Sequence, residues 1–211
     1  MPKFLFVDDH AIVRTGLKRV IEDAIPHSII DEAMDGDSAL EKIKKNDYDL
    51  VVMDVNMPNT DSFGVLSTIL AYKPALKIMM FSMNAEEIYA KRYMKMGAMG
   101  YLRKDSAGSE IKRAFEMVLD NKKYISSELS QMLLDVLHGD SGPDNPFDRL
   151  SARELEIVQH LIRGDSVGAI SQKLHLHTST IGTHKARIFN KLKCDNIIDL
   201  DKLAKLHNIS V

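Results

Sequence analysis

The sequence is short of the residues that cross-link small extracellular proteins. Its 211 residues include one cysteine, Cys194, and no tryptophan. A lone cysteine cannot form an internal disulfide or supply a cysteine-based zinc site, which excludes disulfide scaffolds and zinc fingers. We therefore interpret Cys194 as a small packed residue and expect the fold to depend on its hydrophobic core.

Long apolar segments are also missing. The apolar runs extend over only four to six residues, too few to span a membrane. The first ten residues, MPKFLFVDDH, reach two acids before any signal-peptide core can form. We therefore expect a cytoplasmic protein with no membrane partner. The 45% hydrophobic and 27% charged residues exclude a disordered chain, and the length suits two small domains.

Acidic and basic residues are divided unevenly along the chain. Before Arg149 there are 18 basic and 24 acidic residues, and from Arg149 onward there are 10 basic and 6 acidic ones. The segment from Ser171 to Lys193 holds five basic residues and no acid. An acidic first part suits binding of a cation or a cationic partner, and a basic second part suits binding of a polyanion such as DNA. A basic segment is also typical of a solvated helix face, so charge alone leaves both interpretations open.

Short apolar runs alternate with helical segments over the first 121 residues. The segments between the runs repeat apolar residues at helical spacing. We expect strands at 4–7, 50–53, 78–81 and 100–103, with a weaker one at 28–30. Five such units predict an α/β fold, a doubly wound parallel sheet of five strands with helices on both faces.

The rest of the chain predicts a connection and a small helical domain. Residues 122–148 form the expected linker, which contains one helical segment followed by the turn-forming sequence GDSGPDNPFD. Residues 149–211 then hold four short helices, expected at 152–162, 167–174, 179–192 and 197–206. This arrangement favours a compact all-α domain with a helix-turn-helix.

Polar residues follow the expected strands. Asp8 and Asp9 come after the first run, and Asp54, Ser82 and Lys104 come after later ones. Because the carboxyl ends of parallel strands meet at one edge of a sheet, these side chains should lie together. Three clustered carboxylates repel one another unless a cation is present. Oxygen ligands with no cysteine or histidine pair nearby favour Mg²⁺.

Such a cluster has the groups needed for phosphoryl transfer to a carboxylate. A carboxylate beside Mg²⁺ can attack a phosphoryl group to give an aspartyl phosphate, while a lysine ammonium pairs with the phosphoryl oxygens. Ser82 is placed to hydrogen-bond a further oxygen. The alternative interpretation makes the three acids turn formers at strand ends and Lys104 a surface lysine. The complete set favours the phosphoryl-transfer site.

These residues also belong to motifs of a known family. The motifs VDDH at 7–10, DVNMP at 54–58, FS at 81–82 and GYLRK at 100–104 resemble the receiver domain of two-component response regulators, over residues 1–121. The resemblance implies a flavodoxin-like fold with Asp54 as the phosphoacceptor. It also implies that Lys104 and Ser82 contact the phosphoryl group and that Tyr101 is an aromatic switch.

The same resemblance implies a Mg²⁺ ligand set. Asp9 would bind directly, Asp8 through water and Asn56 through its main-chain carbonyl, and Asp54 also belongs to the set. Two residues depart from the family pattern. Asp105 stands where many receivers have proline, and Ser62 stands where many have glycine. The conformation of the two neighbouring loops therefore stays open.

The segment from Leu150 to Leu192 resembles the LuxR-type helix-turn-helix, so the whole chain resembles the NarL/FixJ subfamily of response regulators. Ser151 and Glu154 have the spacing of a capping box that begins the first helix. Thr178 and Ser179 are N-cap candidates for the recognition helix, which would lie in the major groove of double-stranded DNA. Its candidate DNA contacts are Thr180, Thr183, His184, Lys185, Arg187 and Lys191.

Two features beside the recognition helix have simpler interpretations. Gly182 departs from the family pattern, since many relatives have lysine or serine there, and glycine lowers helix propensity. His175 and His177 have no acid or cysteine partner in the segment. We interpret both histidines as turn residues and not as metal ligands.

We carry three hypotheses for function. The first is a transcription regulator that a sensor histidine kinase phosphorylates on Asp54 and that acts through sequence-specific DNA binding. The second is a receiver that takes no phosphate and acts by constitutive protein contact. The third, a metabolic enzyme on a Rossmann-like sheet, lacks a glycine fingerprint after the first strand. We therefore expect no enzyme beyond a receiver that promotes its own phosphorylation and dephosphorylation.

The last expected helix, at 197–206, has more apolar residues than one core-facing stripe requires. The resemblance implies that this helix pairs two DNA-binding domains. We therefore expect a homodimer when the chain is phosphorylated or bound to DNA. The alternative is that all of these residues pack inside their own domain.

Overall fold

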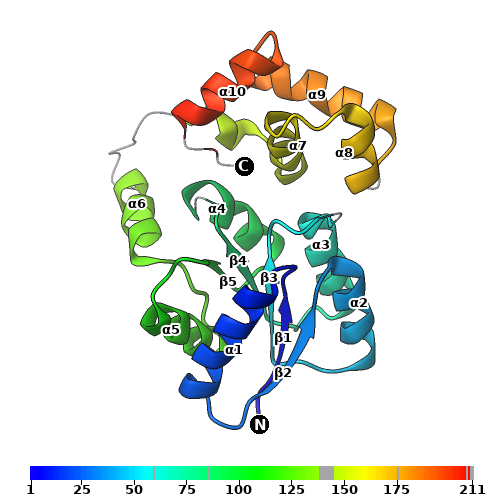
Figure 1. Ribbon diagram of the computed structural model, residues 1–211. Helices are drawn as coiled ribbons and strands as arrows, with labels where there is room; N and C mark the ends of the chain where they lie inside the picture. Colours follow the sequence, from blue (N-terminus) through cyan, green and yellow to red (C-terminus); the bar gives the residue numbers. More distant parts are fainter. Residues whose placement is uncertain (59, 85, 138–144, 175, 208, 210–211) are drawn as a thin grey trace.

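The computed structural model describes residues 1–58, 60–84, 86–137, 145–174, 176–207 and 209. Figure 1 shows a sheet flanked by helices, formed by the first part of the chain, and a group of helices above it, formed by the last part. The sheet has five parallel strands in the order β2-β1-β3-β4-β5. They are β1 (Lys3–Val7), β2 (Ile29–Ala33), β3 (Leu50–Asp54), β4 (Ile78–Ser82) and β5 (Gly100–Arg103). The predicted doubly wound sheet is confirmed.

Five helices cover the two faces of the sheet. Helices α1 (Ala11–Ala24) and α5 (Gly108–Leu119) lie on one face, visible at the front in Figure 1. Helices α2 (Gly36–Lys45), α3 (Ser62–Tyr72) and α4 (Glu86–Met96) lie on the other. Successive strand residues point to opposite faces, so Phe4 and Phe6 pack with Phe115 of α5, whereas Leu5 and Val7 belong to the opposite core.

The second strand lies later in the chain than predicted. It covers Ile29–Ala33 and not 28–30, and it includes Asp31 and Glu32. This strand is at the sheet edge, where polar side chains reach partners at the rim: Asp31 accepts a hydrogen bond from Tyr48, and Glu32 pairs with Arg14. A search for apolar runs therefore locates only its first residues.

The last part of the chain is helical, as predicted. Helix α6 (Ser127–Leu137) lies within the segment expected to connect the two domains, and residues 138–144 of that segment are outside the described residues. A short 3₁₀ helix, η1 (Pro146–Arg149), follows and was not predicted. Its Phe147 is fully buried in the helical core, so the turn-forming sequence does not remain a free linker to its end.

Four helices complete this part of the chain. They are α7 (Ala152–Ile162), α8 (Val167–Lys173), α9 (Thr178–Leu192) and α10 (Ile197–Leu206). The predicted capping box is confirmed, because Ser151 and Glu154 each bond the other's backbone amide. The core forms from apolar residues at helical spacing, among them Ile181, Ile188 and Leu192 of α9. Within the described part of the chain, no helix is long and apolar enough to cross a membrane.

Candidate functional site

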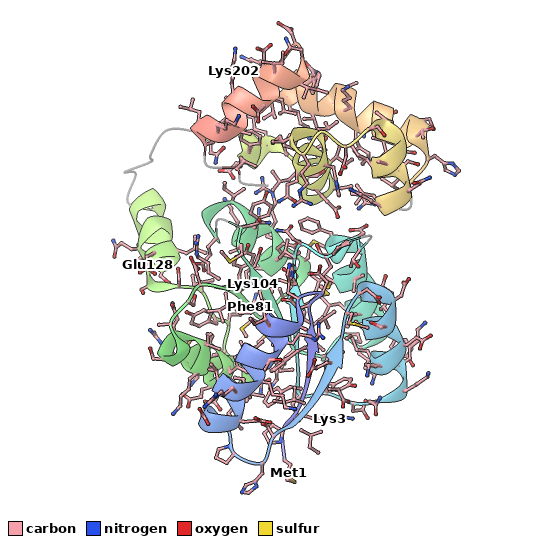
Figure 2. All side chains as sticks on the ribbon, viewed as in Figure 1. Met1, Lys3, Phe81, Lys104, Glu128 and Lys202 are labelled. Carbon is pink, nitrogen blue, oxygen red and sulfur yellow. The ribbon has the colours of Figure 1, made fainter. Side chains whose placement is uncertain are left out.

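The carboxyl ends of β1, β3, β4 and β5 bring the predicted polar residues together. Asp54 and Ser82 are the last residues of β3 and β4, and Asp8 and Lys104 come directly after β1 and β5. The backbone amide of Lys104 donates to the Ser82 carbonyl at 2.9 Å, which continues the β4–β5 pairing. Figure 2 shows Lys104 at the end of the strands that faces the helical part, far from Met1 and Lys3.

Lys104 links two of the carboxylates. Its ammonium lies 2.7 Å from Asp8 Oδ2 and 2.8 Å from Asp54 Oδ2. Burial raises the pKa of Asp54 above its ordinary value, and the Lys104 ammonium opposes this shift. Burial also disfavours the charged form of Lys104, but its two carboxylate partners outweigh burial and raise its pKa. Lys104 therefore stays charged at neutral pH and compensates part of the negative charge of the carboxylates.

The cluster can hold a divalent cation. Ligand atoms of Asp8, Asp9, His10 and Asp54 all lie within 4.8 Å of one another. Most are hard carboxylate oxygens, which Mg²⁺ prefers. The imidazole of His10, which we did not predict as part of the cluster, has its Nδ1 2.9 Å from Asp9 Oδ1 and 3.3 Å from Asp8 Oδ1. The three carboxylates therefore fit Mg²⁺, and the exposed imidazole of His10 lies beside them.

Asn84 connects the other predicted site residues, and sequence reasoning missed it. Its backbone amide donates to Ser82 Oγ at 3.0 Å, and its carbonyl accepts from the Tyr101 hydroxyl at 3.2 Å. Its side-chain carbonyl accepts from Asn56 Nδ2 at 2.9 Å. Asn56 in turn donates its backbone amide to Asp54 Oδ1 at 3.1 Å. The only signal in the sequence was a polar residue two positions after Ser82, at the end of an expected strand.

The two departures from the family pattern have local partners. Ser62 begins α3, and its hydroxyl lies 2.8 Å from that of Tyr93 in the core. Asp105 forms two hydrogen bonds with the Arg103 guanidinium, at 2.6 and 2.8 Å. Neither residue contacts the carboxylate cluster, so both substitutions affect the loops beside the site and not its ligands.

Helix α9 carries the second set of predicted residues. Thr183, Lys185 and Arg187 are partly or fully exposed, whereas His184 has a partly buried ring whose pKa burial lowers. The Lys185 ammonium lies 5.5 Å from the centre of the Phe189 ring. The structure leaves open space at Gly182, so no close packing requires glycine there.

Two expectations about α9 need correction or qualification. The N-cap prediction is wrong: Thr178 is already helical, and His177, with an extended backbone and no side-chain cap bond, is the N-cap. Position 175 is outside the described residues. Lys191 differs from the other basic candidates because its ammonium pairs with the buried Glu154 carboxylate at 2.6 Å.

Paired charges join the helical part to the sheet part. Arg153 Nη1 of α7 lies 2.6 Å from Asp61 Oδ2 at the start of α3 and 2.6 Å from Glu156 Oε2. Arg92 of α4 donates to the Phe147 carbonyl at 2.5 Å. Burial raises the pKa of Glu156 to about 8, Asp61 adds to the shift, and Arg153 opposes it. These residues lie far apart in the sequence and no pattern predicted their contact.

Two family models match the chain. The response regulator receiver domain matches residues 4–116, and the model described as bacterial regulatory proteins, luxR family, matches residues 148–204. Response regulator UvrY of Escherichia coli (strain K12) is 32% identical over 209 residues, which are 99% of this chain and 96% of UvrY. Response regulator GacA of Pseudomonas aeruginosa is also 32% identical over 209 residues, 99% of this chain and 98% of GacA.

Solved structures resemble all or part of the chain. RcsB from Salmonella enterica serovar Typhimurium, bound to promoter rprA in the presence of phosphomimetic BeF3-, superposes with a TM-score of 0.77. It shares 24% identity, and the match covers 100% of this chain and 99% of RcsB, which shows a shared fold. A LuxR-family response regulator from Aurantimonas sp. SI85-9A1 has 29% identity and a TM-score of 0.60, over 64% of this chain and 97% of its own. The chain belongs to the NarL/FixJ-type response regulators, which join a receiver domain to a LuxR-type DNA-binding domain.

Proposed function

We propose that a sensor histidine kinase phosphorylates Asp54 and that phosphorylation controls transcription through sequence-specific binding to double-stranded DNA. The position of the Asp54 carboxylate carries the proposal: it ends β3 beside Asp8, with the Lys104 ammonium 2.8 Å away. A carboxylate held between one cation and the ligands for another is arranged to attack a phosphoryl group. We place this exchange in the cytoplasm.

The residues around Asp54 would hold Mg²⁺. Asp9 and Asp54 would bind it directly, Asp8 through water and Asn56 through its main-chain carbonyl. The closeness of the carboxylate oxygens supports this assignment. When bound, Mg²⁺ would offset the charge that develops on the transferred phosphoryl group.

The transfer exchanges one bond to phosphorus for another. An Asp54 carboxylate oxygen attacks, the new O–P bond forms, and the P–N bond of the kinase phosphohistidine breaks, so that the imidazole leaves with the electron pair. Lys104 then pairs with phosphoryl oxygens in place of the carboxylate, and the Ser82 hydroxyl hydrogen-bonds one of them. Tyr101 acts as the switch, because its hydroxyl is bonded to Asn84, the residue that also fixes Ser82.

The domain limits follow the same division of roles. We propose that residues 1–121 form the receiver, 122–148 the linker with α6, and 149–211 the DNA-binding domain. Helix α9 would lie in the major groove and α10 would pair two copies as a homodimer. The contacts that we propose on α9 are Thr180, Thr183, His184, Lys185, Arg187 and Lys191.

Phosphate incorporation into the full chain tests the proposal. With Mg²⁺ and acetyl phosphate, intact mass should increase by one phosphoryl group, and Asp54→Asn should abolish the increase because an amide is a poor nucleophile. Asp47→Asn, at an exposed carboxylate paired with Lys73, is the matched control and should label normally. Undiminished labelling of Asp54→Asn would reject the acceptor. A wild-type chain that takes no label would favour constitutive protein contact instead.

A further inference from the structure

A cavity lies between the phosphorylation site and the DNA-binding domain. Its volume is about 350 Å³. The receiver contributes Asp9, His10 and Asn56 to its wall, and helices α7 and α8 with the turn between them contribute His160, Arg163 and Lys173. Two residues of this wall adjoin the acceptor: Asp9 belongs to the same carboxylate cluster as Asp54, and Asn56 donates its backbone amide to Asp54 Oδ1. The DNA-binding domain thus forms one wall of a space that adjoins the carboxylate cluster.

The side chains from the DNA-binding domain differ in their available charge. Lys173 lies 2.8 Å from Asp165 Oδ2 and the His160 ring nitrogen lies 2.7 Å from the same oxygen, so the Lys173 charge is already paired. Among the described residues, no carboxylate forms an ion pair with Arg163. Arg163 is the C-cap of α7 and precedes Gly164, whose positive φ of 85° turns the chain so that Asp165 returns to His160. Arg163 is exposed and lines the cavity, and its charge is free to meet a ligand.

The opposite wall determines what this charge can attract. The three carboxylates outnumber Lys104, so the receiver side is negative without a metal ion. A divalent cation would bring that side to formal neutrality, and Arg163 would then make the cavity positive. A small anion would be favoured in the cavity under the same condition that phosphorylation requires.

A buried polar group beside the cavity supports a ligand there. A smaller recess of about 20 Å³ shares Asn56, His160 and Arg163 with the cavity and is also lined by Gln159. Gln159 is 5% exposed, and its Nε2 has no hydrogen-bond partner among the described residues. Buried donors are nearly always satisfied, so this amide points to a polar group that is not part of the described chain. An anion held by Arg163 would accept such a hydrogen bond directly or through water.

We propose that Arg163 of the DNA-binding domain binds small acyl phosphate donors. The Arg163 guanidinium would contact the leaving group of the donor. The inference rests on the proposed phosphorylation of Asp54. An Asp54 oxygen attacks the phosphorus, the O–P bond to the acyl group breaks, and the acyl oxygen departs with the electron pair as a carboxylate. A guanidinium binds a carboxylate through two parallel N–H···O bonds, so Arg163 fits the charge that develops on this leaving group.

This arrangement predicts selectivity between donors. Phosphoramidate transfers the same phosphoryl group but releases a neutral amine once a proton has been taken up, which gives Arg163 no carboxylate to bind. Arg163 should therefore accelerate transfer from acetyl phosphate more than transfer from phosphoramidate. An effect on access alone would change both reactions by the same factor.

The test compares both donors in the full chain with saturating Mg²⁺. Arg163→Gln should slow labelling by acetyl phosphate about tenfold or more and labelling by phosphoramidate less than about twofold. Arg163→Lys keeps the charge without the paired donors and should fall between Arg163→Gln and wild type. Arg19→Gln, at an exposed arginine on α1, is the matched control. Thermal midpoints of all variants should agree, because Arg163 is exposed.

The outcomes separate the inference from the proposed function. A wild-type chain labelled by neither donor would refute phosphorylation itself. Wild-type labelling by both donors, combined with equal changes or no change in Arg163→Gln, would overturn the inference alone. Faster labelling of Arg163→Gln by both donors would also overturn it, and would show that this side chain only obstructs the site.

Discussion

The Lys104 ammonium lies 2.8 Å from Asp54 Oδ2 and 2.7 Å from Asp8 Oδ2, and so occupies oxygens that a bound divalent cation would also need. If Mg²⁺ binds as proposed, the lysine and the metal ion should compete for these carboxylates until a phosphoryl group provides further oxygens. We therefore expect Lys104 to have two effects in the free protein: to stabilise the buried acids and to weaken cation binding.

Replacing Lys104 by methionine should expose both effects. Removing one partner of a buried ion pair leaves an uncompensated charge, so Lys104→Met should lower the free energy of unfolding without metal by about 2–4 kcal/mol. Added Mg²⁺ should raise the thermal midpoint more in this variant than in wild type, because the cation meets no competing ammonium. Thermal unfolding across a Mg²⁺ titration measures both quantities.

Lys112→Met, on the exposed face of α5, is the control and should behave as wild type. Equal responses of wild type and Lys104→Met to Mg²⁺ would show that the lysine does not compete for the ligands.

The site could be predicted because strand ends converge. The short apolar runs locate the strands, and a parallel sheet then requires Asp8, Asp54 and Lys104 to meet at one edge. Asn84 was missed since it follows β4 by two residues and forms its contacts mainly through loop geometry. The strand β2 was misplaced because an edge strand needs no continuous apolar run.

The contact between the domains had no comparable signal. Asp61, Arg153 and Glu156 are charged residues near helix starts, and each is ordinary on a solvated surface. In the docked structure Glu156 is buried and lines one recess with Phe63 and Tyr93 of the receiver. Relative domain position depends on a few such pairs, which single-sequence patterns do not encode.

The buried Glu156 carboxyl should make docking of the two domains depend on pH. Its pKa is about 8 in the docked structure, against an ordinary value of 4.5. The docked form therefore retains a proton that the undocked form loses, so docking is strongest below about pH 4.5 and weakens as pH rises toward 8. Glu156→Gln removes this ionisation and should make the docked population at pH 8 at least about tenfold larger relative to the undocked one. Small-angle X-ray scattering from pH 5 to 8.5 measures the change as a radius of gyration.

Glu128→Gln, at an exposed residue of α6, serves as the control, and its profile should follow wild type. A radius of gyration that is independent of pH in wild type would contradict the assignment of Glu156 to docking.

The basic residues of α9 should contribute unequally to DNA binding, because one of them already has an ion-pair partner within its own domain. If Arg187 neutralises a DNA phosphate, Arg187→Ala should weaken binding to all sequences and reduce the salt slope of log K by about one unit. Lys191 is already bound by Glu154, so Lys191→Ala should reduce the slope by less than about half a unit. Fluorescence anisotropy at several salt concentrations gives the slopes, with Lys18→Ala of α1 as the control. Equal reductions for Arg187 and Lys191 would mean that the Glu154 pair opens on DNA.

Helix α10 should pair two copies through its outer apolar side chains. Leu200 and Ala204 are fully buried, which accounts for the inner face, whereas Ile198 is 66% and Leu206 75% exposed. The alternative that all apolar residues of this helix pack inside their own domain is therefore wrong for these two side chains.

In a twofold interface Ile198 and Leu206 are each buried in both copies, and burial of such a side chain contributes about 1.5–3 kcal/mol. Replacing both by serine should raise the dimer dissociation constant by about 100-fold or more and leave only half of the operator protected in footprints. Ile12→Ser, at an apolar residue of α1 that is also exposed, should leave assembly on DNA unchanged. Sedimentation of the full phosphorylated chain with operator DNA decides: a double variant that still binds as a dimer would place the interface on another surface.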